Sequence, residues 1–187
     1  MNVKEIQKNI SVEKVMRILA INEISGNENT ICRFSFAGGI SGYSFGRSQF
    51  DVKHNPGARD FLIKKCNFTQ DEIQRLLNLD KNIGDLNEKL KNYRKEIDEY
   101  DLAHVKAMIN HVAGLEGLPD MDEKTFIHLV DYHNQFNLEK KGKMHGWLKG
   151  KSSLTPEEIK EFKLGLKWGV ENPDDVKKRW RNIEKNY

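Results

Sequence analysis

The sequence predicts an α+β fold that is mainly α, with a helical domain and one small β-hairpin. Two observations support this prediction. Over most of the chain, apolar residues recur three or four positions apart, and several of these stretches begin at a helix cap. The segment from Ile31 to Val52 instead alternates between apolar and polar residues and is interrupted by glycines, which is typical of short strands and turns.

The helical elements are predicted from their caps and apolar stripes. Ser11 can cap a first helix, whose stripe is Val12, Val15, Met16 and Leu19 and which Ser25-Gly26 ends. Further helices are predicted from the capping box Thr69/Glu72, from Asp101 onward, over Glu123 to Phe136, from Thr155-Pro156 and from Asn172-Pro173. We expect a solvated helix over Asn82 to Asp98 and a flexible loop over Lys140 to Lys151.

Length and composition indicate a single soluble domain spanning residues 1–187. Hydrophobic residues make up 37% and charged residues 32% of the chain, as in an ordinary soluble protein. No membrane insertion is expected, because no apolar run approaches the ~20 residues that span a bilayer. The start of the chain lacks the apolar segment of a secretory signal, which predicts that the protein is cytoplasmic on synthesis.

The net charge of +3 favours an anionic partner, such as cell-wall polymer. No nucleic acid partner is expected, because the basic residues are not clustered as a groove-tracking patch requires. Cys32 and Cys66 form no metal-binding spacing and are too few for a disulfide framework, so both are predicted to be buried or half-buried thiols. Among the six histidines only His104 and His111 lie two helical turns apart, and each histidine is predicted to be structural. Neither a metal nor a cofactor is expected.

Glu23 occupies an inward position of the first helix, four residues after Leu19, where the pattern calls for an apolar side chain. Glycoside hydrolysis needs a carboxylic acid that stays protonated near neutral pH, and partial burial favours that form. Glu23 is therefore the candidate general acid. Spacing alone favours a structural role, in which Glu23 caps the helix end or pairs with an arginine.

The segment Ser41 to Gln49 strengthens the catalytic interpretation. It resembles the loop that follows the catalytic glutamate in the lysozyme-like superfamily, which includes phage endolysins, goose-type lysozymes, lytic transglycosylases and chitosanases. Several of these carry a G-x-S-x-G-x-x-Q-like pattern, and Gly42, Ser44, Gly46 and Gln49 stand in that register. The resemblance is strongest over residues 12–60 and weaker toward the C-terminus, where 131–136 and 172–179 are similar to segments of phage wall hydrolases.

The resemblance implies a lysozyme-like domain with the hairpin beside the active-site cleft. About residues 1–60 would form the catalytic helix and hairpin, and about 61–187 the helical lobe. The implied activity is that of a muramidase, which cleaves the β-1,4 bond between N-acetylmuramic acid and N-acetylglucosamine with Glu23 as acid. The implied partner is the peptidoglycan glycan strand, bound by a monomer without a cofactor. The enzyme would reach the cell wall after release or export by a separate system, as a phage endolysin or an antibacterial effector does.

The second catalytic group stays open. The separation between Glu23 and Gln49 is longer than in transglycosylases, and the short Glu-Asp-Thr spacing of phage-type lysozymes is absent. Asp51 is the first candidate, and Ser44 or Gln49 holding a water or an acetamido group is the second. Glu28 is a rival acid, but it lies in a polar turn.

Substrate-binding candidates come from the hairpin and from one later helix. They are Ser41, Gly42, Tyr43, Phe45, Asp131 and Asn134. Tyr43, Phe45 and Trp147 can stack on sugar rings, because aromatic faces suit the apolar side of a pyranose. A core position is the alternative for Phe45, and a solvated flank is the alternative for Asp131 and Asn134.

Three other functions remain as alternatives: a lytic transglycosylase, a chitosanase-like glycosidase, and a non-catalytic wall-binding module. A degenerate module would tolerate glutamine at position 23, so the glutamate favours an enzyme. Gly42-x-Ser44-x-Gly46 also matches the nucleophile elbow of serine hydrolases. That motif needs a parallel sheet, and the chain shows no strand–helix alternation that would build one.

Overall fold

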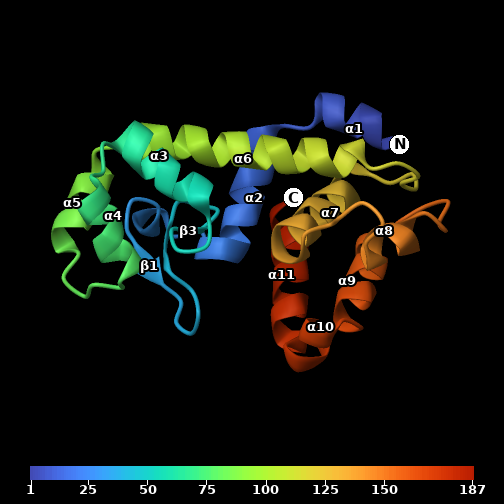
Figure 1. Cartoon of the computed structure of the whole chain (residues 1–187). Coiled ribbons are helices and arrows are strands. Elements are labelled where there is room, and N and C mark those ends of the chain that lie inside the picture. The colour runs from blue at the N-terminus through green and yellow to red at the C-terminus, as the bar shows by residue number, and fades with distance from the viewer. The chain divides into compact units, whose positions relative to one another are not determined.

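A computed structural model describes residues 1–187 and confirms a mainly helical α+β chain (Figure 1). It contains eleven α-helices, a 3-10 helix and one small sheet. The sheet has three short antiparallel strands in the order β1-β2-β3, where the sequence predicted the two strands of a hairpin. No helix is both long enough and apolar enough to cross a membrane.

The chain divides into two compact units. Unit 1 comprises Met1–Asn22 and His104–Tyr187, and unit 2 comprises Glu23–Ala103. Their boundaries fall inside α2 (Val12–Ile24) and α6 (Arg94–Gly114). The division therefore does not follow the expected break near residue 60.

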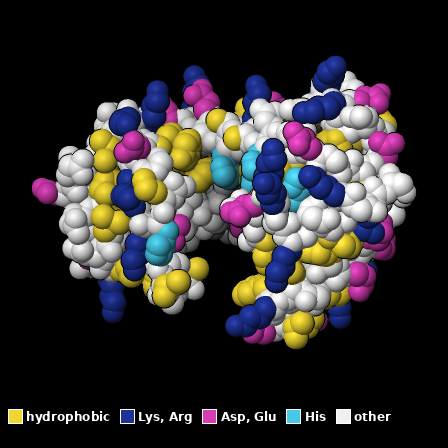
Figure 2. All heavy atoms as spheres, turned by 45° about the vertical axis from the view of Figure 1, so that its right-hand side comes forward, with side chains coloured by type: hydrophobic (Ala, Val, Ile, Leu, Met, Phe, Trp, Pro, Cys, Tyr) yellow, Lys and Arg dark blue, Asp and Glu magenta, His cyan; other side chains and the backbone are white.

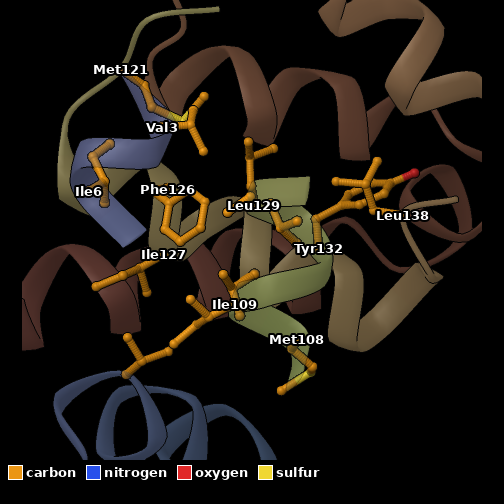
Figure 3. Packing of buried hydrophobic residues seen from close by; sticks show 14 of the residues in the cluster. Val3, Ile6, Met108, Ile109, Met121, Phe126, Ile127, Leu129, Tyr132 and Leu138 are labelled. Carbon is orange, nitrogen blue, oxygen red and sulfur yellow. The ribbon is translucent and has the colours of Figure 1, made fainter. Parts of the chain in front are cut away.

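Unit 1 is entirely helical. Besides parts of α2 and α6 it contains α1 (Val3–Asn9), α7 (Glu123–Phe136), α8 (Lys143–Leu148), α9 (Pro156–Leu164), α10 (Lys167–Glu171) and α11 (Pro173–Asn186). The helix α7 is central, since eight consecutive residues from Thr125 to Tyr132 are buried. Figure 3 shows its Phe126 and Leu129 among apolar side chains of α1 and α6, including Ile6 and Ile109.

Unit 2 contains the sheet and three complete helices. Its elements are η1 (Glu28–Thr30), β1 (Ser35–Phe36), β2 (Tyr43–Phe45), β3 (Phe50–Asp51), α3 (Pro56–Cys66), α4 (Gln70–Leu77) and α5 (Gly84–Lys91). Its core is aromatic. The fully buried ring of Phe45 packs against those of Phe34, Phe50 and Phe61, with centroids 5.7–6.0 Å apart.

Several predicted caps are confirmed. The Ser11 hydroxyl accepts a hydrogen bond from the backbone of Lys14, and complete capping boxes begin α4 at Thr69 and α9 at Thr155. Each cap satisfies backbone N–H groups that the first turn of a helix leaves without partners. The two cysteines are free, with Cys66 buried and Cys32 half-buried, as predicted.

Three predicted boundaries are wrong. The helix expected from Asp101 begins at Arg94, because the buried Ile97 extends the apolar stripe further back. The solvated helix expected over 82–98 is the shorter α5 followed by the start of α6, and Leu86 and Leu90 bury one face of α5. The flexible loop expected over 140–151 contains α8, which forms because Met144 and Leu148 lie one turn apart and are both buried.

The molecular surface carries charges of both signs. In Figure 2, Lys and Arg side chains are interspersed with Asp and Glu over the visible face. This distribution agrees with the small net charge of +3.

Candidate functional site

Glu23 is the penultimate residue of α2 and the first residue of unit 2. The helix ends at Ile24 because Ser25 and Gly26 adopt left-handed conformations, with φ of 54° and 68°. The Glu23 side chain is half-buried. The structure therefore confirms the predicted helix stop and places the candidate acid in the same unit as the sheet.

The G-x-S-x-G-x-x-Q-like segment forms β2 and the turn that leads to β3. Phe45 pairs with Phe50, so residues 46–49 make the turn, in which Gly46 and Gln49 have φ of 78° and 50°. The Gln49 side-chain amide donates a hydrogen bond of 2.9 Å to the carbonyl oxygen of Gly46. Gln49 thus closes its own turn. A Cβ atom at Gly46 would lie 3.1 Å from both Asp101 and Phe50, which explains why glycine stands there.

Asp101, on α6, anchors this turn and was not recognised in the sequence. Its fully buried carboxylate accepts hydrogen bonds from the backbone N–H groups of Arg47 (2.8 Å) and Ser48 (2.9 Å). Burial raises the pKa of Asp101, and the hydrogen bonds from Arg47 and Ser48 only partly oppose that rise. One signal was available, because Asp101 interrupts the buried stripe of Ile97 and Val105 as Glu23 interrupts that of α2.

A balanced cluster of charges fixes the side chain at the tip of the turn. Arg47 forms ion pairs with Asp98 and with Glu28, the latter at 3.1 Å. Arg94 also pairs with Glu28, and with Asp98 at 3.1 Å. The rival acid Glu28 therefore lies between two guanidinium groups, where it helps to hold the turn.

The Asp51 carboxylate is hydrogen-bonded to the neighbouring backbone. Its carboxylate accepts hydrogen bonds from the N–H groups of Gly42 (3.0 Å), Lys53 (2.7 Å) and His54 (3.0 Å), and the His54 ring lies 3.1 Å away. Partial burial acts to raise the pKa of Asp51, but the hydrogen bonds from Gly42, His54 and Lys53 outweigh it and lower the pKa. A Cβ at Gly42 would lie 2.7 Å from this carboxylate, so Gly42 permits the close approach.

The remaining hairpin candidates differ in their roles. Phe45 is fully buried, so it belongs to the core, as the alternative prediction held, and has no surface to offer a sugar ring. The Tyr43 hydroxyl donates to the carbonyl oxygen of Asp80 (2.9 Å), and the Ser41 hydroxyl donates to that of Gly38 (2.5 Å). Ser44 is half-buried and pairs with Asp51 across the strands.

The loop between β1 and β2 adds two candidates that sequence reasoning missed. Phe36 and Ile40 are 48% and 87% exposed, and Gly38 and Gly39 lie between them in left-handed conformations. Large apolar side chains at an exposed tip are available for contact with a ligand. No periodic pattern marks a short loop, so the sequence alone did not single them out.

The candidates of unit 1 lie on α7. Asp131 is only 1% exposed, and its carboxylate binds Arg179 (2.7 Å), Lys163 (3.1 Å) and Asn22 (3.0 Å). Burial acts to raise the pKa of Asp131, but Lys163 and Arg179 hold it well below its ordinary range. Asp131 is therefore neither a solvated flank nor an exposed binding group. Asn134, one turn later, is half-buried.

The histidines His111 and His133 are structural, as predicted. Their rings stack with centroids 4.3 Å apart, and His133 accepts a hydrogen bond from the backbone N–H of Leu138. Burial, with the neighbouring His111 and His104, lowers the pKa of His133 to about 4. No group of three or more His, Cys, Asp or Glu side chains is arranged to hold a metal ion.

Comparisons of the chain with models of protein families, with curated proteins and with solved structures found no match. The functional interpretation therefore depends on the residues of the candidate site.

Proposed function

We propose that this protein is a peptidoglycan hydrolase of the lysozyme-like kind, a muramidase with Glu23 as general acid. One observation supports the proposal above the others. Glu23 begins the same compact unit that contains the glycine-rich turn with Ser44, Gln49 and Asp51. All four catalytic candidates thus belong to one unit of 81 residues, Glu23–Ala103. The sequence indicated Glu23 from the first helix and the other three from one segment, residues 44–51.

The turn has the rigidity that a binding wall needs. Asp101 holds its backbone from beneath, and Arg47 is fixed by Asp98 and Glu28. A loop that is ordered before binding loses less conformational entropy when a glycan binds. The proposed site is therefore the surface of unit 2 at this turn.

In the proposed reaction, the carboxylic acid of Glu23 donates its proton to the glycosidic oxygen. The bond between that oxygen and C1 breaks, and positive charge develops on C1 and the ring oxygen. Water held near Ser44 and Gln49 then adds to C1, and its proton passes to the Glu23 carboxylate. The acid is thereby restored, and the glycan acquires a reducing end.

A lytic transglycosylase is the second candidate, and the surroundings of Asp51 favour it over a muramidase that uses Asp51 as nucleophile. Three backbone N–H groups occupy the Asp51 carboxylate, so a role as nucleophile would break the turn that it stabilises. A transglycosylase needs no second carboxylate. The 6-hydroxyl of the muramic acid residue attacks C1 in place of water, its proton passes to Glu23, and a 1,6-anhydro end forms.

The test is digestion of purified peptidoglycan by the full chain, followed by mass spectrometry of the products. The parent should cut between muramic acid and glucosamine residues, and Glu23→Gln should lose about 10²–10⁴-fold in rate, because the amide cannot donate the proton. The matched control is Glu88→Gln, since the Glu88 side chain is 71% exposed on α5 and outside the site.

The products separate the candidates. Reducing ends support the muramidase, and anhydro ends support the transglycosylase. Cleavage of chitosan with peptidoglycan left intact would instead identify a chitosanase-like enzyme, and wall binding without cleavage would identify a non-catalytic module. If Glu23→Gln keeps a rate within threefold of the parent and an unchanged circular dichroism spectrum, Glu23 is not the acid.

A further inference from the structure

Unit 2 contains a pocket whose lining residues come from two helices and not from the glycine-rich turn. It lies between α3 and α6 and has a volume of about 440 Å³. The residues that matter here are Phe61, Lys64 and Lys65 of α3 and Glu96, Glu99 and Tyr100 of α6. Lys64 and Lys65 follow Phe61 by three and four positions, and Glu99 and Tyr100 follow Glu96 by the same spacing, so each set occupies one helix face.

The floor of the pocket is aromatic. The rings of Phe61 and Tyr100 are stacked, with centroids 4.3 Å apart and an interplanar angle of 11°. Phe61 is 8% exposed, while Tyr100 is half-buried. Burial raises the pKa of Tyr100, and the nearby charges of Asp101 and Asp60 act in the same direction, so its phenol is neutral at physiological pH. The floor therefore offers an uncharged surface to an aliphatic or planar group.

The two walls carry opposite charges that do not neutralise each other. Lys64 pairs with Asp60 of its own helix (2.7 Å), and Glu99 lies 3.9 Å from Lys95 of its own helix. Lys65 and Glu96 form no ion pair, and no ion pair spans the pocket. One cation and one anion therefore remain available on opposite walls, above an aromatic floor.

We propose that this pocket binds a short zwitterionic peptide, with a carboxylate at Lys65 and an ammonium group at Glu96. This inference rests on the proposed function, under which the ligand is the stem peptide of peptidoglycan, whose residues supply carboxylates and an amine. A neutral glycan would leave both charges without partners. A polyanion would meet Glu96 and Glu99, which repel it.

The pocket would thus hold the peptide while the glycine-rich turn holds the glycan. The wall polymer carries both, because each stem peptide is attached to a muramic acid residue. Binding of the two parts on one unit would favour peptide-bearing strands over bare glycan, since the second contact forms intramolecularly.

The test uses the full chain labelled with ¹⁵N and a free stem tetrapeptide with a diamino acid at its third position. Titration should shift the amide signals of residues 61–65 and 96–103 more strongly than those of 41–51. Lys65→Glu should weaken binding about three- to tenfold, which is the effect expected of a partly exposed charge contact. The control is Lys81→Glu, because Lys81 is an exposed residue of unit 2 that does not line the pocket.

A second experiment varies the charge of the ligand. An acetylated and amidated form of the same peptide, which lacks its end charges and side-chain amine, should bind more weakly than the free peptide. Absence of shifts at 61–65 and 96–103, or equal affinities for Lys65→Glu and Lys81→Glu, overturns the proposal. Because the peptide is not cleaved, peptide binding without wall hydrolysis refutes only the proposed function, and wall hydrolysis without peptide binding refutes only this inference.

Discussion

Replacing Asp101 by asparagine tests whether this buried carboxylate holds the glycine-rich turn. The parent carboxylate presents one oxygen to the N–H of Arg47 and the other to the N–H of Ser48. Asparagine keeps a single oxygen and turns an amide NH₂ group toward the second N–H. The substitution therefore changes two hydrogen bonds with little change in side-chain volume.

The expected loss follows from these contacts. A hydrogen bond to a charged acceptor contributes about 1.5–3 kcal/mol, and a buried donor without a partner costs about 1–3 kcal/mol. Removal of a buried charge opposes these losses, because burial is what raises the pKa of Asp101. We expect Asp101→Asn to lower the free energy of opening the turn by about 2–4 kcal/mol.

The assay must report on unit 2. All three tryptophans, Trp147, Trp168 and Trp180, are in unit 1, so tryptophan fluorescence does not follow the turn. Hydrogen exchange of the Arg47 and Ser48 amides does, and the expected loss corresponds to about 30- to 700-fold weaker protection. Asp60→Asn is the control, because Asp60 is an exposed carboxylate of unit 2 that pairs only with Lys64.

The pH dependence of the free energy of opening tests the direction of the Asp101 pKa shift. Asp101 has a higher pKa in the folded chain than its ordinary value of 3.8. Its titration therefore contributes stability below pH 3.8, and this contribution is lost as the pH rises through the folded pKa. Asparagine does not titrate. The difference in free energy of opening between parent and variant should therefore narrow as the pH rises from 3.8 through the folded pKa of Asp101. If the Arg47 and Ser48 amides exchange as slowly in the Asp101→Asn variant as in the Asp60→Asn variant, Asp101 does not hold the turn.

Two further predictions concern the cores of the two units. Phe45→Ala should lower the free energy of unfolding by about 3–5 kcal/mol, because it empties a fully buried aromatic site, as urea unfolding followed by circular dichroism would measure. Phe45→Leu should lose less of the free energy of unfolding. If a folded Phe45→Leu protein binds glycan more weakly than the parent, Phe45 contributes to glycan binding and not only to the core. In unit 1, the pKa of His133 is lowered from 6.5 to about 4, so neutral His133 contributes stability above pH 6.5 that is lost as the pH falls toward 4. Tryptophan-monitored urea unfolding should show this loss, and His133→Gln should reduce it; an equal slope in the variant would exclude His133 as the cause.

Much of the helical fold could be predicted because its signals are local. A capping box joins residues three positions apart, so Thr69 and Thr155 mark helix starts without knowledge of the rest of the chain. The start of α6 was misplaced for the opposite reason. Asp101 resembles an N-cap in sequence, but its hydrogen-bond partners are Arg47 and Ser48, more than 50 residues earlier.

The same limit applies to the binding candidates of α7. Asp131 is polar on a mixed helix face, and such a residue is expected to be accessible to solvent. Its partners Lys163 and Arg179 lie 32 and 48 residues away, and together they make its burial tolerable. No spacing within α7 carries that information, so the error could not be avoided from the sequence.

Three carboxylates of the helices, Glu23, Asp101 and Asp131, were considered above, and the structure distinguishes them. Asp101 and Asp131 are 0% and 1% exposed, so their charges act on the protein itself, one on a turn and the other on two cations. Glu23 is only half-buried. A general acid must be exposed enough to touch the glycosidic oxygen. The half-buried side chain of Glu23 meets this requirement, and this is why the proposed catalytic role is assigned to Glu23 and not to the two more deeply buried carboxylates.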